Sequence, residues 1–281
     1  MEVLNFNIID LSNGLEEKLN FNDYLSGIIS ATTSEEDLDY EALKAYAIIS
    51  RTYAIHNILL LLDSNPNKDI FTTLEIGLTY TKNINNQKIL NAINDTKGEV
   101  IIYDDSIIMP VFFNNGSGFT RNAIEAWGID LPYLVGTTSK QDISSSNYIH
   151  VSEYSYIELF SKLNSYFIDT NISESSLMND IIVVQRDSIG YVTEVQIGDM
   201  RISGEEFSYA LELNSSNFYF EEYNEKIRFI CTGMGHGVGL SIYGANIMAK
   251  EGFKCHEILH HYYKNTEITN LYKNKNILTK K

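Results

Sequence analysis

The stretch that decides the fold lies near the C-terminal end and reads Cys231-Thr-Gly-Met-Gly-His-Gly-Val-Gly-Leu-Ser-Ile-Tyr-Gly-Ala245. Four glycines alternate between positions 233 and 239, with His236 among them. Since glycine has no side chain, this spacing lets backbone or a ligand approach closely. The next run, residues 240–251, predicts a helix that stops at Gly252. We therefore expect His236 on a loop entering a helix N-terminus, where it either serves a ligand or closes a tight packing turn.

A second decisive segment is a long helix predicted upstream. It starts after Asp39, a plausible N-cap, with Glu41 in its first turn, and the Asp-Ser-Asn-Pro cluster at 63–66 ends it. One helical face carries apolar and small residues, namely Leu43, Ala47, Ser50, Ala54 and Ile58. Because that face is mostly Ala and Ser, another element can pack close to it and hold Arg51 firmly on the adjoining face.

The remaining patterns predict an α+β fold, rich in β-structure, with packed helices and two subdomains that form a groove. Alternation predicts three hairpins: residues 3–9 with the segment toward Tyr24, 99–103 with 107–113, and 181–184 with 191–197. Residues 153–167 have helical spacing. We expect one domain at 1–270, an inserted subdomain at about 140–220, and a basic tail at 271–281.

Composition limits the classes of function. The 281 residues and 44% hydrophobic content suffice for a real core. With 37 acidic and 21 basic side chains, the net charge of -16 repels phosphate backbones, so nucleic acid is excluded as a partner. We see no apolar run of ~20 residues and no signal peptide, and therefore expect no transmembrane segment in this chain. Cys231 and Cys255 are too few for a disulfide framework and leave their redox state open.

The glycine-histidine stretch and the segment 41–54 together resemble the SpoIID family, the stage II sporulation protein D and amidase-enhancer proteins of spore-forming bacteria. Residues 112–120, Trp127 and 132–134 resemble the family's central segment, and 202–207 with 211–218 resemble a further stretch. The pieces occur in the family's order and cover most of the chain from about Tyr24 to Tyr263. The resemblance implies a place in the cell envelope of a spore-forming bacterium.

The resemblance also implies a lytic transglycosylase that acts on peptidoglycan glycan strands stripped of their peptides. Such a reaction needs an acid for the glycosidic oxygen and then a base for the muramyl C6 hydroxyl, and one carboxyl group can serve both steps. In the family this group is a glutamate. Thr32 holds its position here, or Thr33 with a different gap. A threonine hydroxyl cannot exchange protons as a tuned carboxyl does, so the family's reaction is in question.

Two nearby carboxylates offer an alternative. Glu35 or Glu36 could replace the missing acid, although a shift of about 1 Å already costs about a hundredfold in rate. Otherwise both belong to a solvated acidic loop.

The binding residues that the resemblance implies are distributed along the chain. Arg51 can donate forked hydrogen bonds to lactyl or acetamido oxygens, or form a structural ion pair. His236 and Tyr243 belong to the glycine-histidine stretch. The central loop supplies possible partners for sugar hydroxyls that could equally form turns, namely Asn114, Asn115, Ser117 and Thr120.

We expect no metal and no cofactor. Some members of the family carry cysteine and histidine zinc ligands in a segment that corresponds to residues 71–80, where this chain has apolar residues or glycine instead. A second candidate set lies within 31 residues but contains no CxxC or HExxH spacing. It consists of Cys231, His236, Cys255, His256, His260 and His261.

The leading interpretation is a peptidoglycan-directed sporulation protein, a pseudoenzyme that binds glycan strands through a degenerate lytic transglycosylase site. Two alternatives remain: an active transglycosylase with a relocated carboxylate, and a module that binds and stimulates a cell-wall amidase or another sporulation hydrolase through its acidic surface.

Overall fold

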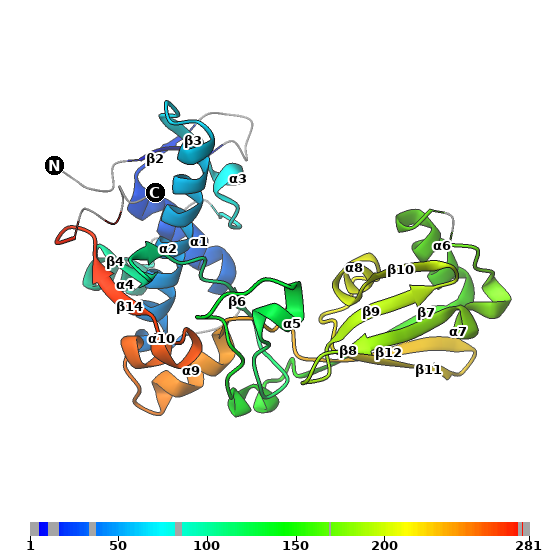
Figure 1. Cartoon of the computed structure of the whole chain (residues 1–281). Coiled ribbons are helices and arrows are strands. Elements are labelled where there is room, and N and C mark those ends of the chain that lie inside the picture. The colour runs from blue at the N-terminus through cyan, green and yellow to red at the C-terminus, as the bar shows by residue number, and fades with distance from the viewer. Residues whose placement is uncertain are drawn as a thin grey trace. The chain divides into compact units, whose positions relative to one another are not determined.

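The computed structural model describes residues 6–10, 17–33, 38–81, 86–168, 170–274 and 277. The chain divides into two compact units (Figure 1). Unit 1 comprises Met1–Val111 and Ala245–Lys281, and unit 2 comprises Phe112–Gly244. Helices and several small sheets occur together, so the α+β prediction is confirmed. The subdomain expected at 140–220 lies within unit 2.

Helix α2, Tyr40–Ser64, organises unit 1. Asp39 caps its N-terminus by accepting from the Glu41 backbone N–H, and Asn65 follows as the C-cap, as the sequence predicted. The predicted face is buried along its whole length. Helices α1 (Phe21–Thr33), α4 (Gln87–Asp95) and α10 (Cys255–Tyr262) pack against α2.

Two small sheets complete unit 1, with the short helix α3, Thr73–Ile76. Strand β1 (Asn7–Asp10) pairs with β2 (Glu17–Leu19) and with β3 (Ile70–Thr72), and β4 (Glu99–Tyr103) pairs with β5 (Ser106–Ile107) and β14 (Glu267–Asn270). Both predicted hairpins exist. Residues 3–5 of the first lie outside the described residues, and the second is shorter than expected because β5 ends at Ile107. The segment toward Tyr24 is helix α1, because its apolar residues Tyr24, Leu25, Ile28 and Ile29 follow a helical period and are buried.

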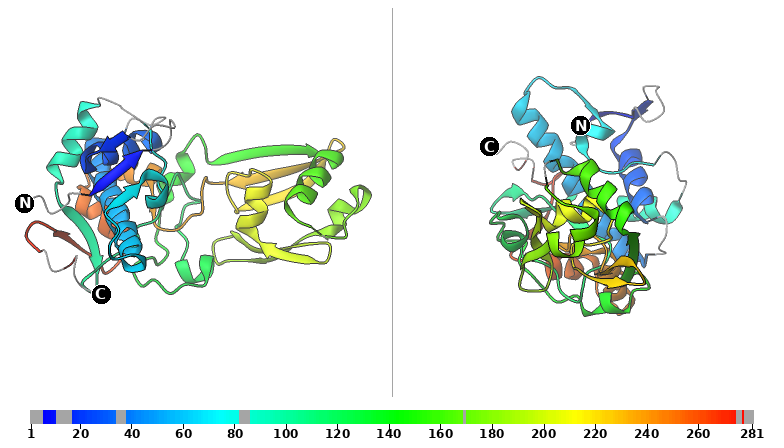
Figure 2. Two further views of the ribbon diagram at one scale, coloured as in Figure 1. Left: turned by 90° about the horizontal axis from the view of Figure 1, so that it is seen from above. Right: turned by 90° about the vertical axis from the view of Figure 1, so that its right-hand side faces the viewer.

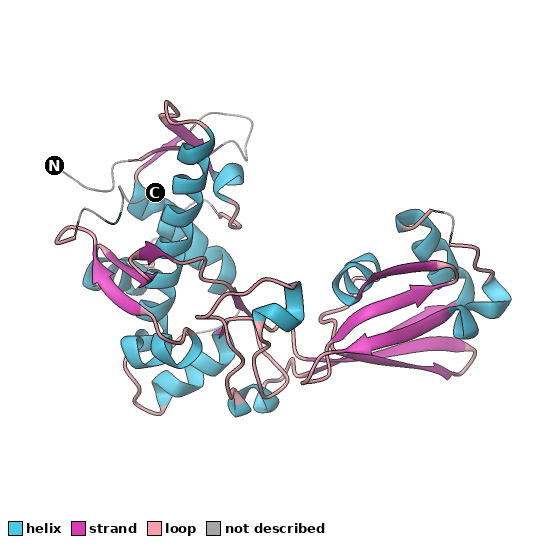
Figure 3. Ribbon diagram, in the orientation of Figure 1, coloured by secondary structure: helices cyan, strands magenta, loops and turns pink. Residues whose placement is uncertain are grey.

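Unit 2 contains most of the long strands (Figure 3). One antiparallel sheet has the order β11-β12-β7 and the other β10-β9-β8. The strands and their bounds are β7 (Ile149–Ser155), β8 (Ile181–Arg186), β9 (Val192–Ile197), β10 (Met200–Ser203), β11 (Phe218–Tyr223) and β12 (Lys226–Thr232). The β8–β9 pair confirms the third predicted hairpin.

One apolar core joins both sheets of unit 2 to its helices. Side chains from both sheets meet those of α6 (Tyr156–Tyr166), α7 (Leu177–Asp180) and α8 (Gly204–Ala210). The green-to-yellow part of Figure 2 shows these strands and helices. Residues 153–155, predicted as helix, end strand β7, and α6 begins only after the Ser155 capping box.

The rest of unit 2 is a loop-rich part around a short parallel pair. Strand β6 (Phe112–Phe113) pairs with β13 (Leu240–Ser241), accompanied by α5 (Ala123–Trp127) and the short 3-10 helix Lys140–Ser144. Another 3-10 turn, Glu174–Ser176, precedes α7. Helix α9, Ile242–Lys250, starts two residues later than predicted because Leu240 and Ser241 are taken up by β13. The division between the units falls inside this helix.

Within the described residues, α2 is long and apolar enough to cross a membrane by length and composition. Of its most apolar window, 61% is buried, as in the core helix of a folded unit.

Candidate functional site

The glycine-histidine loop is shaped by its glycines. Gly233, Gly235, Gly237 and Gly239 all have positive φ, between 75° and 108°, where a side chain is strained. A Cβ on Gly235 would lie 2.8 Å from the Phe113 Cβ, and one on Gly237 would lie 2.7 Å from the Tyr191 ring. The alternation therefore serves close backbone approach, as the sequence predicted.

His236 is held from both ring nitrogens. Its Nδ1 accepts from the Val238 backbone N–H at 3.1 Å, which leaves Nε2 to donate to the Phe112 carbonyl at 3.1 Å. Burial lowers the pKa of His236 to about 4, and the charge of Arg121 acts in the same direction. The ring is therefore neutral at pH 7 and has a fixed tautomer.

Arg121 is a buried, charged residue that contacts this loop. Its Nε donates to Asp187 and its Nη1 to Glu205, both at 2.7 Å, and Nη1 also donates to the His236 carbonyl at 3.1 Å. The guanidinium lies 4.6 Å from the centre of the Tyr191 ring. The Asp187 side chain is almost fully buried, whereas that of Glu205 is partly exposed. Arg121 thus anchors the backbone of the loop to carboxylates from the β8–β9 turn and from α8.

Trp127 completes this network on the side of α5. Its indole N–H donates to Glu205 at 3.3 Å, and its ring centre lies 5.4 Å from that of His236. The His236 ring is therefore part of the immediate environment of the Trp127 indole.

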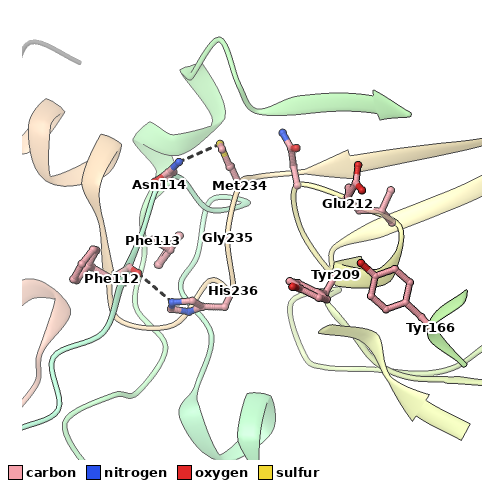
Figure 4. Close-up of a pocket in the computed structure, with 11 residues that line it drawn as sticks. Phe112, Phe113, Asn114, Tyr166, Tyr209, Glu212, Met234, Gly235 and His236 are labelled. Atoms are coloured by element: carbon pink, nitrogen blue, oxygen red, sulfur yellow. Dashed lines mark hydrogen bonds between the residues drawn. The ribbon is translucent and has the colours of Figure 1, made fainter. Parts of the chain in front are cut away.

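A pocket of about 580 Å³ opens beside His236 within unit 2 (Figure 4). The loop and β6 line one side, and α6, α8 and the residues after α8 line the other. Its lining residues are Phe112, Phe113, Asn114, Tyr166, Tyr209, Glu212, Leu213, Asn214, Met234, Gly235 and His236. The volume is in the range of small-ligand sites.

The other predicted residues of unit 2 surround the loop with different exposures. Asn114 is exposed and lines the pocket, while its carbonyl accepts from the Tyr243 backbone N–H at 3.0 Å. Tyr243 is half-buried with its hydroxyl 3.3 Å from that of Ser144. The structure thus brings Asn114 and His236 together in one pocket and places Tyr243 beside Asn114.

Asn115, Ser117 and Thr120 are less available for a ligand. Asn115 is buried and its backbone pairs with Met234. Thr120 is buried, and its hydroxyl accepts from the Thr137 backbone N–H at 2.9 Å, so it closes a turn. Ser117 is half-buried beside Tyr191.

Arg51 corrects an expectation for unit 1. The residue is 1% exposed, and its guanidinium donates to the Ile93 and Glu99 carbonyls at 3.0 and 3.1 Å, with the Thr96 hydroxyl at 3.4 Å. Desolvation lowers its pKa to about 10. Arg51 therefore joins α2 to the C-terminal end of α4 and to β4, and its donors are committed to the protein rather than to sugar oxygens.

Thr32 lies in the last turns of α1. It is half-buried, and its hydroxyl donates to the Ile28 carbonyl at 3.1 Å. Glu35 and Glu36, the proposed replacement acids, lie outside the described residues. So do residues 275, 276 and 278–281 of the predicted basic tail.

No group of three potential metal ligands occurs among the residues that the structure describes. Cys231 belongs to the apolar core of unit 2, and Cys255 is buried in unit 1. His256 contacts Glu99 at 2.9 Å.

Three important residues were missed from the sequence. Arg121 stands next to the predicted Thr120, yet the resemblance drew attention to Arg51. Tyr166 and Tyr209 come from two helices far from the motifs, and only the abundance of tyrosine, 19 residues, gave a general signal.

The fold and this site define a two-unit α+β protein in which a glycine-histidine loop borders an aromatic pocket. The chain belongs to the SpoIID family. The family model described as Stage II sporulation protein matches residues 12–103.

The relatives extend beyond that range. Stage II sporulation protein D of Bacillus amyloliquefaciens is 28% identical over 92% of this chain and 76% of its own length. The protein of the same name from Bacillus subtilis is 28% identical over 90% of this chain and 75% of its own. The amidase enhancer of Bacillus subtilis is 23% identical over 82% of this chain, which covers only 38% of that longer protein.

Proposed function

We propose that this protein is a peptidoglycan-directed sporulation protein of the cell envelope that binds glycan strands without cleaving them by the family's acid route. The relatives named Stage II sporulation protein D support the sporulation role. The pocket beside His236 supplies a site of suitable size and lining in unit 2.

The observation that supports the proposal most strongly is the side chain at position 32, a threonine hydroxyl and not a carboxyl group. The position that corresponds to the family's glutamate bears a hydroxyl whose proton is donated to Ile28 within α1. Burial raises the pKa of the neighbouring Tyr46, so this phenol also stays protonated at neutral pH. Neither group can protonate a glycosidic oxygen and then accept a proton in the range where a carboxyl group works.

The test uses purified, peptide-free glycan strands. We expect them to retain the protein in a pull-down, and we expect mass spectrometry of the incubated strands to show no anhydromuramyl products. Absence of retention would contradict the binding role.

A matched set of variants separates binding from cleavage. Thr32→Glu restores a carboxyl group in α1 and should yield anhydromuramyl products, whereas Thr32→Gln has nearly the same size and should not. If the unmodified protein releases these products and Glu35→Gln or Glu36→Gln abolishes them, the alternative of a relocated carboxylate is correct.

A second candidate function is stimulation of a cell-wall amidase. The similarity to the amidase enhancer and the net charge of -16 favour it, because an acidic surface attracts a basic hydrolase. Co-purification with such a hydrolase that weakens as salt rises would support this function. Binding that is insensitive to salt would oppose it.

A further inference from the structure

Two exposed tyrosines form one wall of the pocket beside His236. The Tyr209 residue is 76% exposed and Tyr166 is 48% exposed. Their rings meet edge to face with centres 6.1 Å apart. A large ring left in water but fixed by a neighbouring ring is a ready surface for the apolar face of a ligand.

The backbone fixes this wall relative to the loop. After α8 the chain turns through Glu212, which has a positive φ of 53°, and its N–H donates to the Tyr209 carbonyl. The Asn214 carbonyl then accepts from the Gly235 N–H at 2.8 Å. The tyrosine wall and the His236 wall are therefore preorganised, which lowers the entropy cost of binding.

The polar groups of the pocket are amides and one carboxylate. Asn114 and Asn214 can both donate and accept hydrogen bonds. Glu212 is the only charged residue among the described lining residues at neutral pH, since His236 is neutral. The Glu212 carboxylate already accepts from Lys162 at 2.8 Å.

This electrostatic arrangement discriminates between ligands. A sugar that carries a carboxylate would find no cation among the described lining residues, because Lys162 is paired with Glu212, and would meet the field of a strongly acidic protein. An ammonium ligand would have to displace Lys162 from Glu212. A neutral sugar ring meets neither penalty, and its hydroxyl and acetamido groups match the amides.

From these observations we infer that the pocket is a saccharide subsite for a neutral N-acetylhexosamine ring, with the apolar face of the sugar stacked on Tyr209. The inference rests on the proposed glycan binding and deepens it: along a peptide-free strand, the pocket takes the N-acetylglucosamine units rather than the muramyl units, which carry a lactyl carboxylate.

The protein contains its own reporter for this subsite. Trp127 is the single tryptophan of the sequence and contacts the His236 ring. Its fluorescence can be titrated with two probes: the neutral trimer of N-acetylglucosamine and peptide-free glycan strands. We expect both probes to change the Trp127 emission with saturation.

Three variants test the stacking. Tyr209→Ala should lower the affinity for both probes about tenfold, the scale of one lost aromatic contact. Tyr209→Phe should bind both probes as tightly as the parent protein does. Tyr219→Ala is the matched control, because Tyr219 is 59% exposed on β11 and does not line the pocket. Circular dichroism of each variant verifies folding.

The outcomes separate the two proposals. If the parent protein binds strands but Tyr209→Ala binds them equally well, the subsite is wrong and glycan binding stands. If it binds strands but not the neutral trimer, the preference for a neutral ring is wrong. If it binds neither probe, the proposed function fails together with the subsite.

Discussion

Each unit of the molecule buries an arginine, and the two arginines have opposite surroundings. Arg51 of unit 1 donates its hydrogen bonds to neutral acceptors, the Ile93 and Glu99 carbonyls and the Thr96 hydroxyl, and the Glu99 carboxylate acts on it only through its charge. Arg121 of unit 2 is paired with the carboxylates of Asp187 and Glu205. These neutral acceptors suit a residue with a structural role, because carbonyls at the end of α4 attract a cation without adding a second buried charge.

The charged shell of Arg121 serves a different purpose. Here the same guanidinium holds two carboxylates and the His236 carbonyl, so the shape of the loop depends on a balance of buried charges. The arginine found by motif is therefore structural, whereas the arginine that supports the candidate site was found only in the structure.

The largest loss of stability is expected when the buried charge of Arg121 is removed. Arg121→Met leaves the nearly fully buried Asp187 carboxylate without its cation, and we expect a loss of about 3–5 kcal/mol in the free energy of unfolding. Urea denaturation followed by circular dichroism measures it. A double variant, Arg121→Met with Asp187→Asn, removes both charges and should recover part of the loss. A double variant no more stable than Arg121→Met would show that the charge is not the cause.

Arg51→Met is the matched change in unit 1 and should cost less. It leaves neutral carbonyls and a hydroxyl unpaired but also removes a desolvated cation, so we expect a loss of about 2–3 kcal/mol, in the range of hydrogen bonds to charged groups. The same denaturation experiment measures it. The distinction between the two arginines is wrong if Arg51→Met is as destabilising as Arg121→Met, or if Arg51→Met abolishes glycan retention while the fold stays intact.

The fold was predictable where local signals agree. The cap at Asp39, the buried face of α2 and the β8–β9 hairpin follow from a few neighbouring residues and were all predicted. The helical start of α1 was missed because its alternating apolar residues near Asn20 also fit a strand, and burial against α2 and α4 decides between the two.

The site was less predictable because it depends on long-range contacts. The alternating glycines predicted that the loop packs closely against neighbouring residues, because a Cβ at most of these positions would clash with them. No local pattern relates Arg121 to Asp187 or Tyr209 to His236. Arg121 contacts Asp187, and Tyr209 and His236 line one pocket, only after β6, α8 and the loop have assembled. A resemblance of motifs also could not tell a buried Arg51 from a ligand-facing one.

The smallest expected effect concerns the neutral ring that unit 2 holds beside Arg121. Because the pKa of His236 falls from 6.5 to about 4 on folding, the unfolded chain binds its proton first. The contribution of this ring to stability is therefore complete above pH 6.5, is lost as the pH falls toward 4, and changes no further below that. Between pH 7.5 and 4.5 the parent protein should lose roughly 2 kcal/mol more than His236→Asn, whose amide does not titrate.

Denaturation of both proteins at each pH measures this difference, and an NMR titration of the ring C–H gives the pKa directly. Since the charge of Arg121 helps to lower that pKa, Arg121→Met should raise it, whereas Arg51→Met should leave it unchanged. Equal acid sensitivity of the parent protein and His236→Asn would show that the ring is not held neutral. A shift caused by Arg51→Met would mean that the distinction between a structural and a site-supporting arginine does not hold.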